Sequence, residues 1–84
     1  MIKKFYAYIA ECSDGTYYTG FTTDLKKRED AHNSKKGAKY TRTRTPVRII
    51  YHEEFATKGE AMKREYAIKQ LSRDRKKELI RNGV

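Results

Sequence analysis

The sequence predicts a small α+β (mixed α/β) protein in which a three-stranded, mainly antiparallel sheet is flanked by helices in the order ββαβαα. Its 84 residues are enough for one domain, expected to span residues 1–84. Seven tyrosines and three phenylalanines argue against disorder, although charged residues make up 37% of the chain. Segments that alternate with period two, and segments that begin with helix-capping residues, supply the elements of this fold.

The first two strands are expected to form a hairpin. Residues 3–12 alternate, so that one face carries Phe5, Ala7 and Ile9 and the other carries Tyr6, Tyr8 and Ala10. A second β-prone run occupies residues 16–21. The turn signal Ser13-Asp14-Gly15 separates the two runs, which is typical of a tight hairpin.

The length of the hairpin loop decides the pairing of the two strands. A two-residue Asp-Gly turn would place Tyr18 opposite Glu11 and on the other face from Tyr8. A three-residue loop, with Gly15 in the left-handed conformation, places Tyr18 opposite Ala10 instead. We favour the three-residue loop, because Gly15 then occupies the position that needs a positive φ. Tyr18 and Tyr8 are therefore expected to share a face.

A helix, a loop and the third strand follow. Thr23 and Asp24 suit a helix N-terminus, so a helix is predicted for residues 25–32. Residues 34–46 are rich in Lys, Thr, Arg and Gly and end at a proline, which indicates a loop. Residues 47–55 are rich in β-branched and aromatic side chains and are expected to form the third strand.

Two helices are expected to complete the fold. The stretch Thr57-Lys58-Gly59-Glu60 fits a capping box and predicts a helix over residues 58–71. Ser72, with Asp74 in the first turn, begins a last short helix that Asn82-Gly83 ends.

Composition restricts the class of protein. Twenty Lys and Arg against eleven Asp and Glu leave a net charge of +9, which favours a polyanionic partner. The longest apolar run, residues 5–10, is too short for a membrane span or a secretory signal. The single cysteine, Cys12, allows neither an internal disulfide nor a Cys-rich zinc site. A cytoplasmic protein with no membrane partner is expected.

One carboxylate falls on the apolar side of the helix predicted for residues 58–71. On a helical wheel Glu65 lies between Ala61, Met62 and Ile68. Burying a carboxylate is costly unless a counter-charge pairs with it. Two interpretations stay open: a salt bridge to a basic neighbour, which is the commoner outcome, or a ligand for a hard divalent cation.

The helix predicted for residues 25–32 carries a related anomaly. Its only large aliphatic residue is Leu25, and Arg28 and His32 project on the same side, one turn apart. Taken singly, Arg28 is interpreted more simply as a snorkelling arginine, and His32 as a hydrogen-bonded, partly buried histidine. Together they indicate a functional site.

A basic segment lies between residues 34 and 50, where six cations occur without any acidic residue. Hydroxyl and small residues among them suit contact with a phosphodiester backbone. Further cations lie in the last predicted helix, but no helix has the spacing of a base-reading element, so weak sequence preference is expected. The candidate nucleic-acid-binding residues are Lys35, Lys36, Lys39, Arg42, Arg44 and Arg48.

These residues, in this order, resemble the GIY-YIG nuclease family, most closely its small single-domain bacterial branch. The first motif is present as Tyr6-Ala7-Tyr8, which keeps the final tyrosine but not the glycine. The second is Tyr18-Thr19-Gly20, which keeps the tyrosine and the glycine. The remaining points of resemblance are Asp14-Gly15, Asp24-Leu25-Lys26-Lys27-Arg28, Asn33-Ser34, Gly37-Ala38-Lys39-Tyr40-Thr41-Arg42 and Glu65.

The resemblance implies a divalent-metal-dependent endonuclease that hydrolyses phosphodiester bonds in DNA. Tyr8 and Tyr18 match the two motif tyrosines, Arg28 the catalytic arginine, and His32 a position held by His or Tyr in several branches. Glu65 matches the glutamate that binds one cation, Mg²⁺ or Mn²⁺. Whether Tyr18 or His32 activates the water is left open. The implied setting is DNA repair or recombination, on branched or single-stranded intermediates.

Two other classes of function compete with the endonuclease. One is a catalytically weak nucleic-acid-binding module on the same scaffold, and the other is a basic protein bound to ribosomal or other RNA. DNA is favoured over RNA as the partner. The nuclease is favoured over adhesion alone, because adhesion needs no buried carboxylate and Glu65 would repel the backbone unless a cation intervened. Relatives with repair or homing roles join this domain to further domains, so low activity, or a protein partner that supplies targeting, is also expected.

Overall fold

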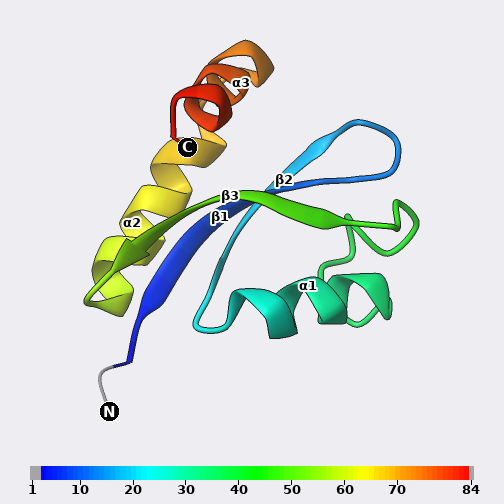
Figure 1. The fold of residues 1–84 in the computed structure, drawn as a ribbon, viewed down its shortest axis with the longest axis horizontal. Coiled ribbons are helices and arrows are strands. Elements are labelled where there is room, and N and C mark those ends of the chain that lie inside the picture. Colours follow the sequence, from blue (N-terminus) through cyan, green and yellow to red (C-terminus); the bar gives the residue numbers. More distant parts are fainter. Residues whose placement is uncertain (1–2, 84) are drawn as a thin grey trace.

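The computed structural model describes residues 3–83, and within them the elements follow the predicted order ββαβαα (Figure 1). The sheet has the strand order β2-β1-β3 with both neighbouring pairs antiparallel, so the first strand is central. The predicted α+β class is confirmed. The elements are β1 (Phe5–Glu11), β2 (Tyr17–Thr22), α1 (Leu25–Asn33), β3 (Arg48–Phe55), α2 (Lys58–Lys69) and α3 (Arg73–Asn82).

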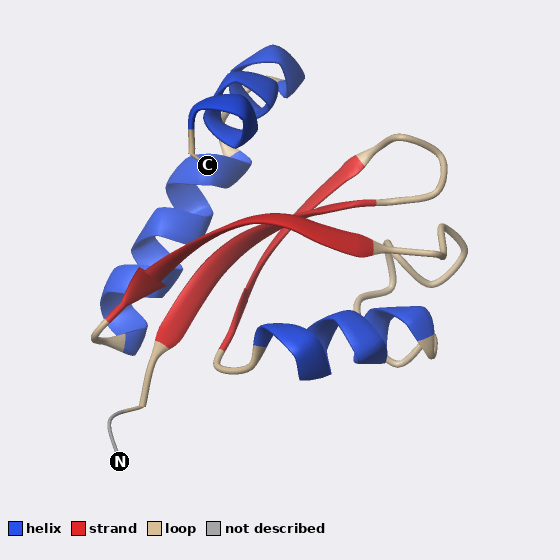
Figure 2. Cartoon of the chain, in the orientation of Figure 1, coloured by secondary structure: helices blue, strands red, loops and turns tan. Residues whose placement is uncertain are grey.

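Helices cover the sheet from both sides: α1 lies on one side, and α2 with α3 on the other (Figure 2). This arrangement follows from the alternation in β1, because successive side chains point to opposite faces. On the α1 side, Tyr8, Ala10, Cys12 and Val47 form one buried cluster, against which Leu25 packs. On the α2 side, Ala7, Ile9 and Ile68 form a second cluster, against which Leu79 and Ile80 of α3 pack.

The hairpin has the register expected for a three-residue loop. Tyr18 pairs with Ala10, and Gly15 has a φ of 83°. The loop is closed by hydrogen bonds from the Cys12 amide to the Thr16 carbonyl (2.8 Å) and from the Gly15 amide to the Cys12 carbonyl (3.0 Å). This prediction is confirmed, and it brings two tyrosine rings together on the α1 face.

Side-chain caps begin all three helices. Asp24 accepts from the amide of Lys27 at the start of α1, and Ser72 accepts from the amide of Arg75 at the start of α3. Thr57 accepts from the Glu60 amide, while its hydroxyl donates to the Glu60 carboxylate (2.8 Å). That reciprocal pair extends the predicted capping box. Among residues 3–83, no helix is long and apolar enough to cross a membrane.

One core prediction is wrong. Met62 was expected on the buried side of α2, but 46% of it is exposed. The helix contacts the sheet along a narrow stripe that passes through Ala61 and Ile68, both fully buried. Position 62 lies about 100° around the helix from position 61, so its side chain projects beyond that stripe into solvent.

The loop of residues 34–46, called here the basic loop, is anchored at three points. The Asn33 side chain donates to the Val47 carbonyl (2.8 Å) and accepts from the Val47 amide (2.6 Å). At the same end of the sheet, the Ser13 amide donates to the Arg44 carbonyl (2.9 Å), and the Arg44 guanidinium pairs with Asp14 (3.0 Å). These contacts hold the loop against the tip of the hairpin.

Candidate active site

Tyr8 is the centre of the candidate site. Its side chain projects from β1 toward the α1 side, is fully buried, and lies across the neighbouring residue Gly20 of β2. A Cβ atom at position 20 would come within 2.5 Å of the Tyr8 hydroxyl oxygen. The glycine of the Tyr18-Thr19-Gly20 motif is therefore needed for space, because the phenol of Tyr8 occupies the volume of a side chain at position 20.

A continuous series of hydrogen bonds joins Tyr8 to α1 and to the basic loop. The Arg28 Nε donates to the Tyr8 hydroxyl (3.3 Å), which lies 2.8 Å from Nε2 of His32. His32 Nδ1 lies 2.8 Å from the Thr41 hydroxyl, and that hydroxyl donates to the carbonyl of Ala38 (3.0 Å). Because the Thr41 hydroxyl has a single proton and donates it to the Ala38 carbonyl, its oxygen accepts the hydrogen bond from His32 Nδ1. His32 Nε2 is then the acceptor of the Tyr8 proton.

The charges at the site follow from burial and from this order of donors. Burial raises the pKa of Tyr8 to about 12, although the Arg28 hydrogen bond opposes that rise. Burial, and then the positive charge of Arg28, lower the pKa of His32. Burial alone would lower the pKa of Arg28, but the hydrogen bond and charge of Tyr8, and then Tyr18, raise it. At neutral pH the site holds a phenol, a neutral imidazole and a guanidinium cation.

Tyr18 lies at the surface end of the same cluster. Its ring centroid is 5.3 Å from that of His32 and 6.4 Å from that of Tyr8. Unlike Tyr8 it is only partly buried, and it borders a surface pocket. Tyr18 is therefore the tyrosine of the pair that solvent and ligands can reach.

Arg28 faces open space as well as the buried tyrosine. With Thr22, Asp24 and Lys27 it lines a pocket of about 290 Å³ beside the start of α1. The hydrogen bond to Tyr8 uses only Nε, so the guanidinium is oriented by the interior while it borders the surface. A planar donor fork in that position suits a phosphate group.

Glu65 approaches the site from α2. Its side chain is 18% exposed and pairs with Lys69, whose Nζ lies 3.4 Å from the carboxylate. The salt bridge expected on general grounds is therefore present. The carboxylate charge is also the weakest of several causes that act on the pKa of Tyr8, which burial raises most.

The donor set fits a loosely held divalent cation and not an all-protein cage. Residues 3–83 contain no group of three or more His, Cys, Asp or Glu side chains that could hold a metal ion. Mg²⁺ needs only one or two carboxylates when water and substrate phosphates supply the other ligands. One half-buried carboxylate, Glu65, satisfies that requirement, with Lys69 occupying the position of the counter-charge.

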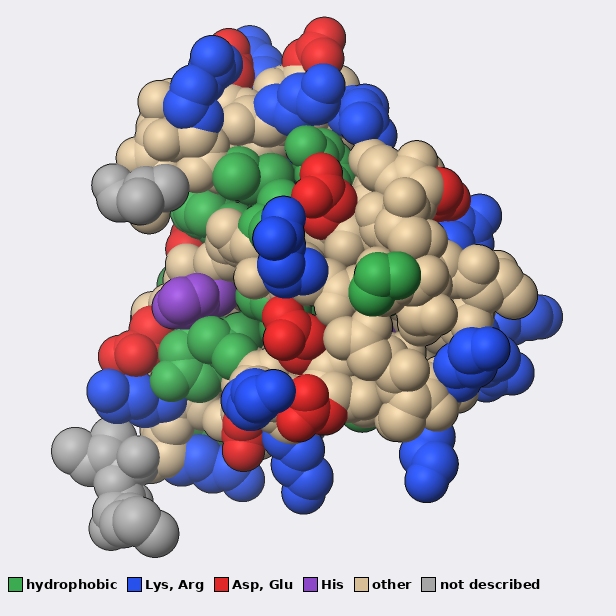
Figure 3. Space-filling model, turned by 45° about the vertical axis from the view of Figure 1, so that its right-hand side comes forward, with side chains coloured by type: hydrophobic (Ala, Val, Ile, Leu, Met, Phe, Trp, Pro, Cys, Tyr) green, Lys and Arg blue, Asp and Glu red, His purple; other side chains and the backbone are tan. Residues whose placement is uncertain are grey.

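The predicted nucleic-acid-binding cations fall into two groups. Two are held by carboxylates: Arg44 pairs with Asp14 (3.0 Å), and Arg48 pairs with Glu11 (3.6 Å). In the space-filling view, Lys and Arg side chains lie around much of the rim of the face shown, and carboxylates are interspersed with them at the rim and nearer the middle (Figure 3). Four others are exposed and form no ion pair within residues 3–83: Lys35, Lys36, Lys39 and Arg42.

Sequence reasoning missed two residues that build the site. Thr41 completes the hydrogen bonding of His32, and Asn33 closes the basic loop on Val47. Neither stands out by periodicity, because each acts across a loop. The only sequence signal was their presence in the stretches quoted for the family resemblance.

Comparison with known proteins identifies the family of the chain. The model of the GIY-YIG catalytic domain matches residues 4–78. The chain belongs to the GIY-YIG family of nuclease domains. The resemblance seen in the motifs is confirmed, and it covers nearly the whole chain.

Its relatives are proteins of similar size. The chain is 60% identical over 75 residues to the UPF0213 protein VNG_2274C of Halobacterium salinarum, covering 89% of this chain and 97% of that one. It is 52% identical over 82 residues to the UPF0213 protein SSP2268 of Staphylococcus saprophyticus, covering 98% and 100%. The solution structure of the UPF0213 protein BH0048 from Bacillus halodurans matches with a TM-score of 0.61 and 49% identity, covering 95% and 86%.

Proposed function

We propose that this protein is a divalent-metal-dependent endonuclease that cleaves DNA. The observation that carries the proposal is the position of Arg28, which is fixed through Nε by the buried Tyr8 and yet lines a surface pocket. In a nuclease-family domain, such a guanidinium can bind the scissile phosphate and stabilise the charge that develops on it.

Tyr18 is assigned the role of orienting or deprotonating the attacking water. His32 is fully buried, and both of its ring nitrogens are engaged, one by Tyr8 and one by Thr41. It therefore has no free nitrogen to offer a water molecule. Tyr18 is partly exposed beside it and within reach of Arg28, so its phenol oxygen is the group that can orient the water or take its proton.

Tyr8 and His32 are then positioning residues. Tyr8 is too deeply buried to touch a substrate, but its hydroxyl orients Arg28, and His32 orients that hydroxyl. This assignment separates the two tyrosines, which the motifs alone present as equivalent. It also explains why a histidine in a nuclease site can be buried and neutral.

Glu65 is the residue that would hold the cation, Mg²⁺ or Mn²⁺. A bound cation supplies positive charge that neutralises the phosphoryl oxygens and the leaving oxygen. Lys69 pairs with Glu65 in this structure, and its flexible ammonium group is free to turn toward a phosphate of the substrate. A half-buried carboxylate next to a DNA backbone is otherwise unfavourable.

Cleavage of supercoiled plasmid and of single-stranded DNA, with Mg²⁺ or Mn²⁺, tests the proposal. Arg28→Lys keeps the charge but loses the fork, and Glu65→Gln keeps the shape but loses the charge. Each is expected to reduce cleavage by about a hundredfold while DNA binding persists. Glu78→Gln, which removes an exposed carboxylate of α3, is the matched control and should cleave normally. EDTA should abolish cleavage by all active proteins.

The competing function is a nucleic-acid-binding module with little catalytic power. The Glu65–Lys69 ion pair favours it, because it satisfies the carboxylate without a cation. Equal background cleavage by the wild type and both variants, with binding retained, would establish the module instead. Within the endonuclease proposal, the expected role is in cytoplasmic DNA repair or recombination, with branched or single-stranded intermediates as substrates and a protein partner supplying targeting.

A further inference from the structure

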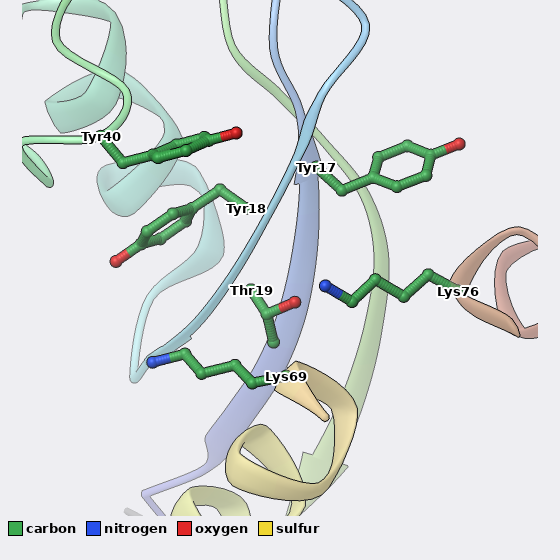
Figure 4. Close-up of a pocket in the computed structure, with 6 residues that line it drawn as sticks. All are labelled: Tyr17, Tyr18, Thr19, Tyr40, Lys69 and Lys76. Carbon is green, nitrogen blue, oxygen red and sulfur yellow. The ribbon is translucent and has the colours of Figure 1, made fainter. Parts of the chain in front are cut away.

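A groove runs along the free edge of the sheet beside the candidate active site. One pocket of about 240 Å³ is lined by Tyr17, Tyr18, Thr19, Tyr40, Lys69 and Lys76 (Figure 4). A second pocket, of about 220 Å³, shares Tyr17, Tyr40 and Lys76 with the first and adds Arg73. Because the two pockets share three residues, they form one continuous depression, called here the edge groove.

The edge groove combines cations with aromatic rings and contains no carboxylate. Lys69 comes from α2 and Lys76 from α3. The Lys76 ammonium points toward Thr19 of β2, while the Lys69 side chain runs below Thr19 toward the Tyr18 side (Figure 4). Arg73 lies over the Tyr17 ring, with its guanidinium carbon 4.9 Å from the centroid. None of the residues lining either pocket is acidic, although the chain has eleven Asp and Glu. The local field therefore favours an anion.

The aromatic rings are already arranged for stacking. Tyr18 and Tyr40 are stacked, with ring centroids 6.0 Å apart and planes 27° apart. Tyr40 is 39% exposed, and its ring is held by Tyr18 and by Arg44, whose guanidinium carbon lies 4.0 Å from the ring centroid. A planar ring that is both fixed and exposed is the usual platform for an unpaired base.

A buried hydroxyl without a partner also belongs to this groove. Thr19 is 3% exposed, and its Oγ1 has no hydrogen-bond partner among the described residues. Leaving a buried hydroxyl unpaired is costly, so such groups are rare in folded proteins. Thr19 lines the larger pocket together with the two lysines, so its unpaired hydroxyl lies in the wall of the groove.

The edge groove shares two residues with the candidate active site. Tyr18, assigned above to the attacking water, lines the larger pocket, and so does Lys69, the partner of Glu65. Arg28 lines a different pocket, so Tyr18 is the residue at which a nucleic-acid strand bound at Arg28 would enter the groove. The second pocket lies further along, toward Arg73 at the start of α3.

We propose that the edge groove binds single-stranded nucleic acid next to the cleaved bond, with an unpaired base against Tyr40 and its phosphates at Lys69, Lys76 and Arg73. The inference rests on the proposed nuclease function and specifies its substrate as a strand that is unpaired on one side of the cut. A duplex cannot use the tyrosines, because its bases are stacked on one another. An acidic peptide would match the cations but would leave the aromatic rings and the Thr19 hydroxyl without a role.

Binding measurements on the full chain test this without any cleavage. Fluorescence anisotropy in EDTA compares a short labelled oligodeoxythymidine with an abasic oligonucleotide of equal length, which has the same phosphates but no bases. The wild type is expected to bind the thymidine probe about tenfold more tightly, and Tyr40→Ala should remove that difference. Tyr40→Phe should retain it. Lys76→Ala should weaken binding of both probes.

Tyr66→Ala is the matched control, because Tyr66 is a tyrosine of α2 that is 68% exposed and does not line the groove. It should bind both probes as the wild type does. Equal wild-type affinity for the two probes, or an equal loss for both in Tyr40→Ala, would overturn the proposal. Displacement by polyglutamate as effective as that by unlabelled oligothymidine would also overturn it, in favour of an acidic peptide. Oligouridine in place of oligothymidine shows whether RNA shares the groove.

Binding and cleavage fail independently. A protein that prefers the thymidine probe but cuts nothing would retain the groove and lose the endonuclease. A protein that cuts in an Arg28-dependent manner but ignores the bases would retain the endonuclease and lose the groove. The two experiments together therefore assign each failure to its own proposal.

Discussion

The imidazole of His32 donates its Nδ1 proton to the hydroxyl of Thr41 across 2.8 Å, and this bond links the basic loop to the candidate active site. It leaves Nε2 as the acceptor for Tyr8, whose oxygen in turn receives the Nε proton of Arg28. A residue of the basic loop thereby determines the tautomer of a buried histidine and, through Tyr8, the orientation of the arginine. Four predictions follow from this network and from its surroundings.

Replacing Thr41 with valine keeps the shape of the side chain and removes its hydroxyl. The buried Nδ1–H of His32 then lacks its partner, so Thr41→Val should lower the free energy of unfolding by about 1–3 kcal/mol. Cleavage should also fall, because Arg28 is held less firmly. Thr43→Val, an exposed position in the same loop, is the control for urea unfolding. Equal stability of the two variants would remove Thr41 from the network.

Stability should depend on pH through His32. Burial and the Arg28 charge depress its folded-state pKa below the ordinary value of 6.5, so the unfolded chain binds the proton more readily. The free energy of unfolding should therefore fall as pH drops below about 6.5, by at most about 1.4 kcal/mol per pH unit. Urea unfolding of the wild type and of His32→Gln between pH 5.5 and 7 measures this pH dependence. The variant should show a flatter profile of unfolding free energy against pH.

That pH window isolates the histidine from the shifted carboxyl groups. Asp14 and Glu53 have pKa values lowered from 3.8 and 4.5, so both stay ionised in the native state throughout it. Identical pH profiles for the wild type and His32→Gln would mean that another group causes the loss of stability. A wild-type profile that rises toward acid would contradict the assigned direction of the shift.

The close approach of Tyr8 to Gly20 makes a second substitution informative. In Gly20→Ala the new methyl group meets the Tyr8 ring and hydroxyl, and overpacking of this kind costs about 1–3 kcal/mol. Gly59→Ala is the matched control, because nothing lies within 4 Å of a Cβ there and the position is helical. That change should raise stability by up to about 1 kcal/mol. Equal changes in the urea midpoint for Gly20→Ala and Gly59→Ala would show that the Tyr8 side chain moves aside without cost.

The exposed cations of the basic loop should dominate the salt dependence of binding. Lys39→Ala combined with Arg42→Ala should lower the slope of log affinity against log salt by about two, since each contributes one phosphate contact. Lys58→Ala combined with Lys63→Ala removes the same charge from α2, on the other side of the sheet, and should leave the slope nearly unchanged. Equal slopes for both double variants would exclude the loop from the contact surface.

Local rules were enough to predict most of the fold. The hairpin register followed from Gly15 alone, because only one loop length places it where φ is positive. The starts of α2 and α3 followed from Thr57 and Ser72 by the geometry of helix capping. Met62 was misplaced because a wheel shows angles and not the width of the contact with the sheet.

The candidate site was only partly predictable. Arg28 and His32 were found because polar residues on an inward face need partners, and the structure supplies those partners in Tyr8 and Thr41. Thr41 itself was not found, because a contact made across a loop produces no periodic pattern in the sequence. The ion pair between Arg44 and Asp14 was also not predicted, because thirty positions separate the two residues in the sequence.

The side-chain amide of Asn33 pairs with Val47 as a neighbouring strand would: it donates one hydrogen bond to the Val47 carbonyl and accepts one from the Val47 amide. The chain between them is closed at its base in the way that a hairpin closes a turn. Between these ends the loop is held again at Thr41 by His32 and at Arg44 by the hairpin tip. The junction thus keeps the exposed cations Lys35, Lys36, Lys39 and Arg42 on one closed loop, whose ends stay fixed to the scaffold.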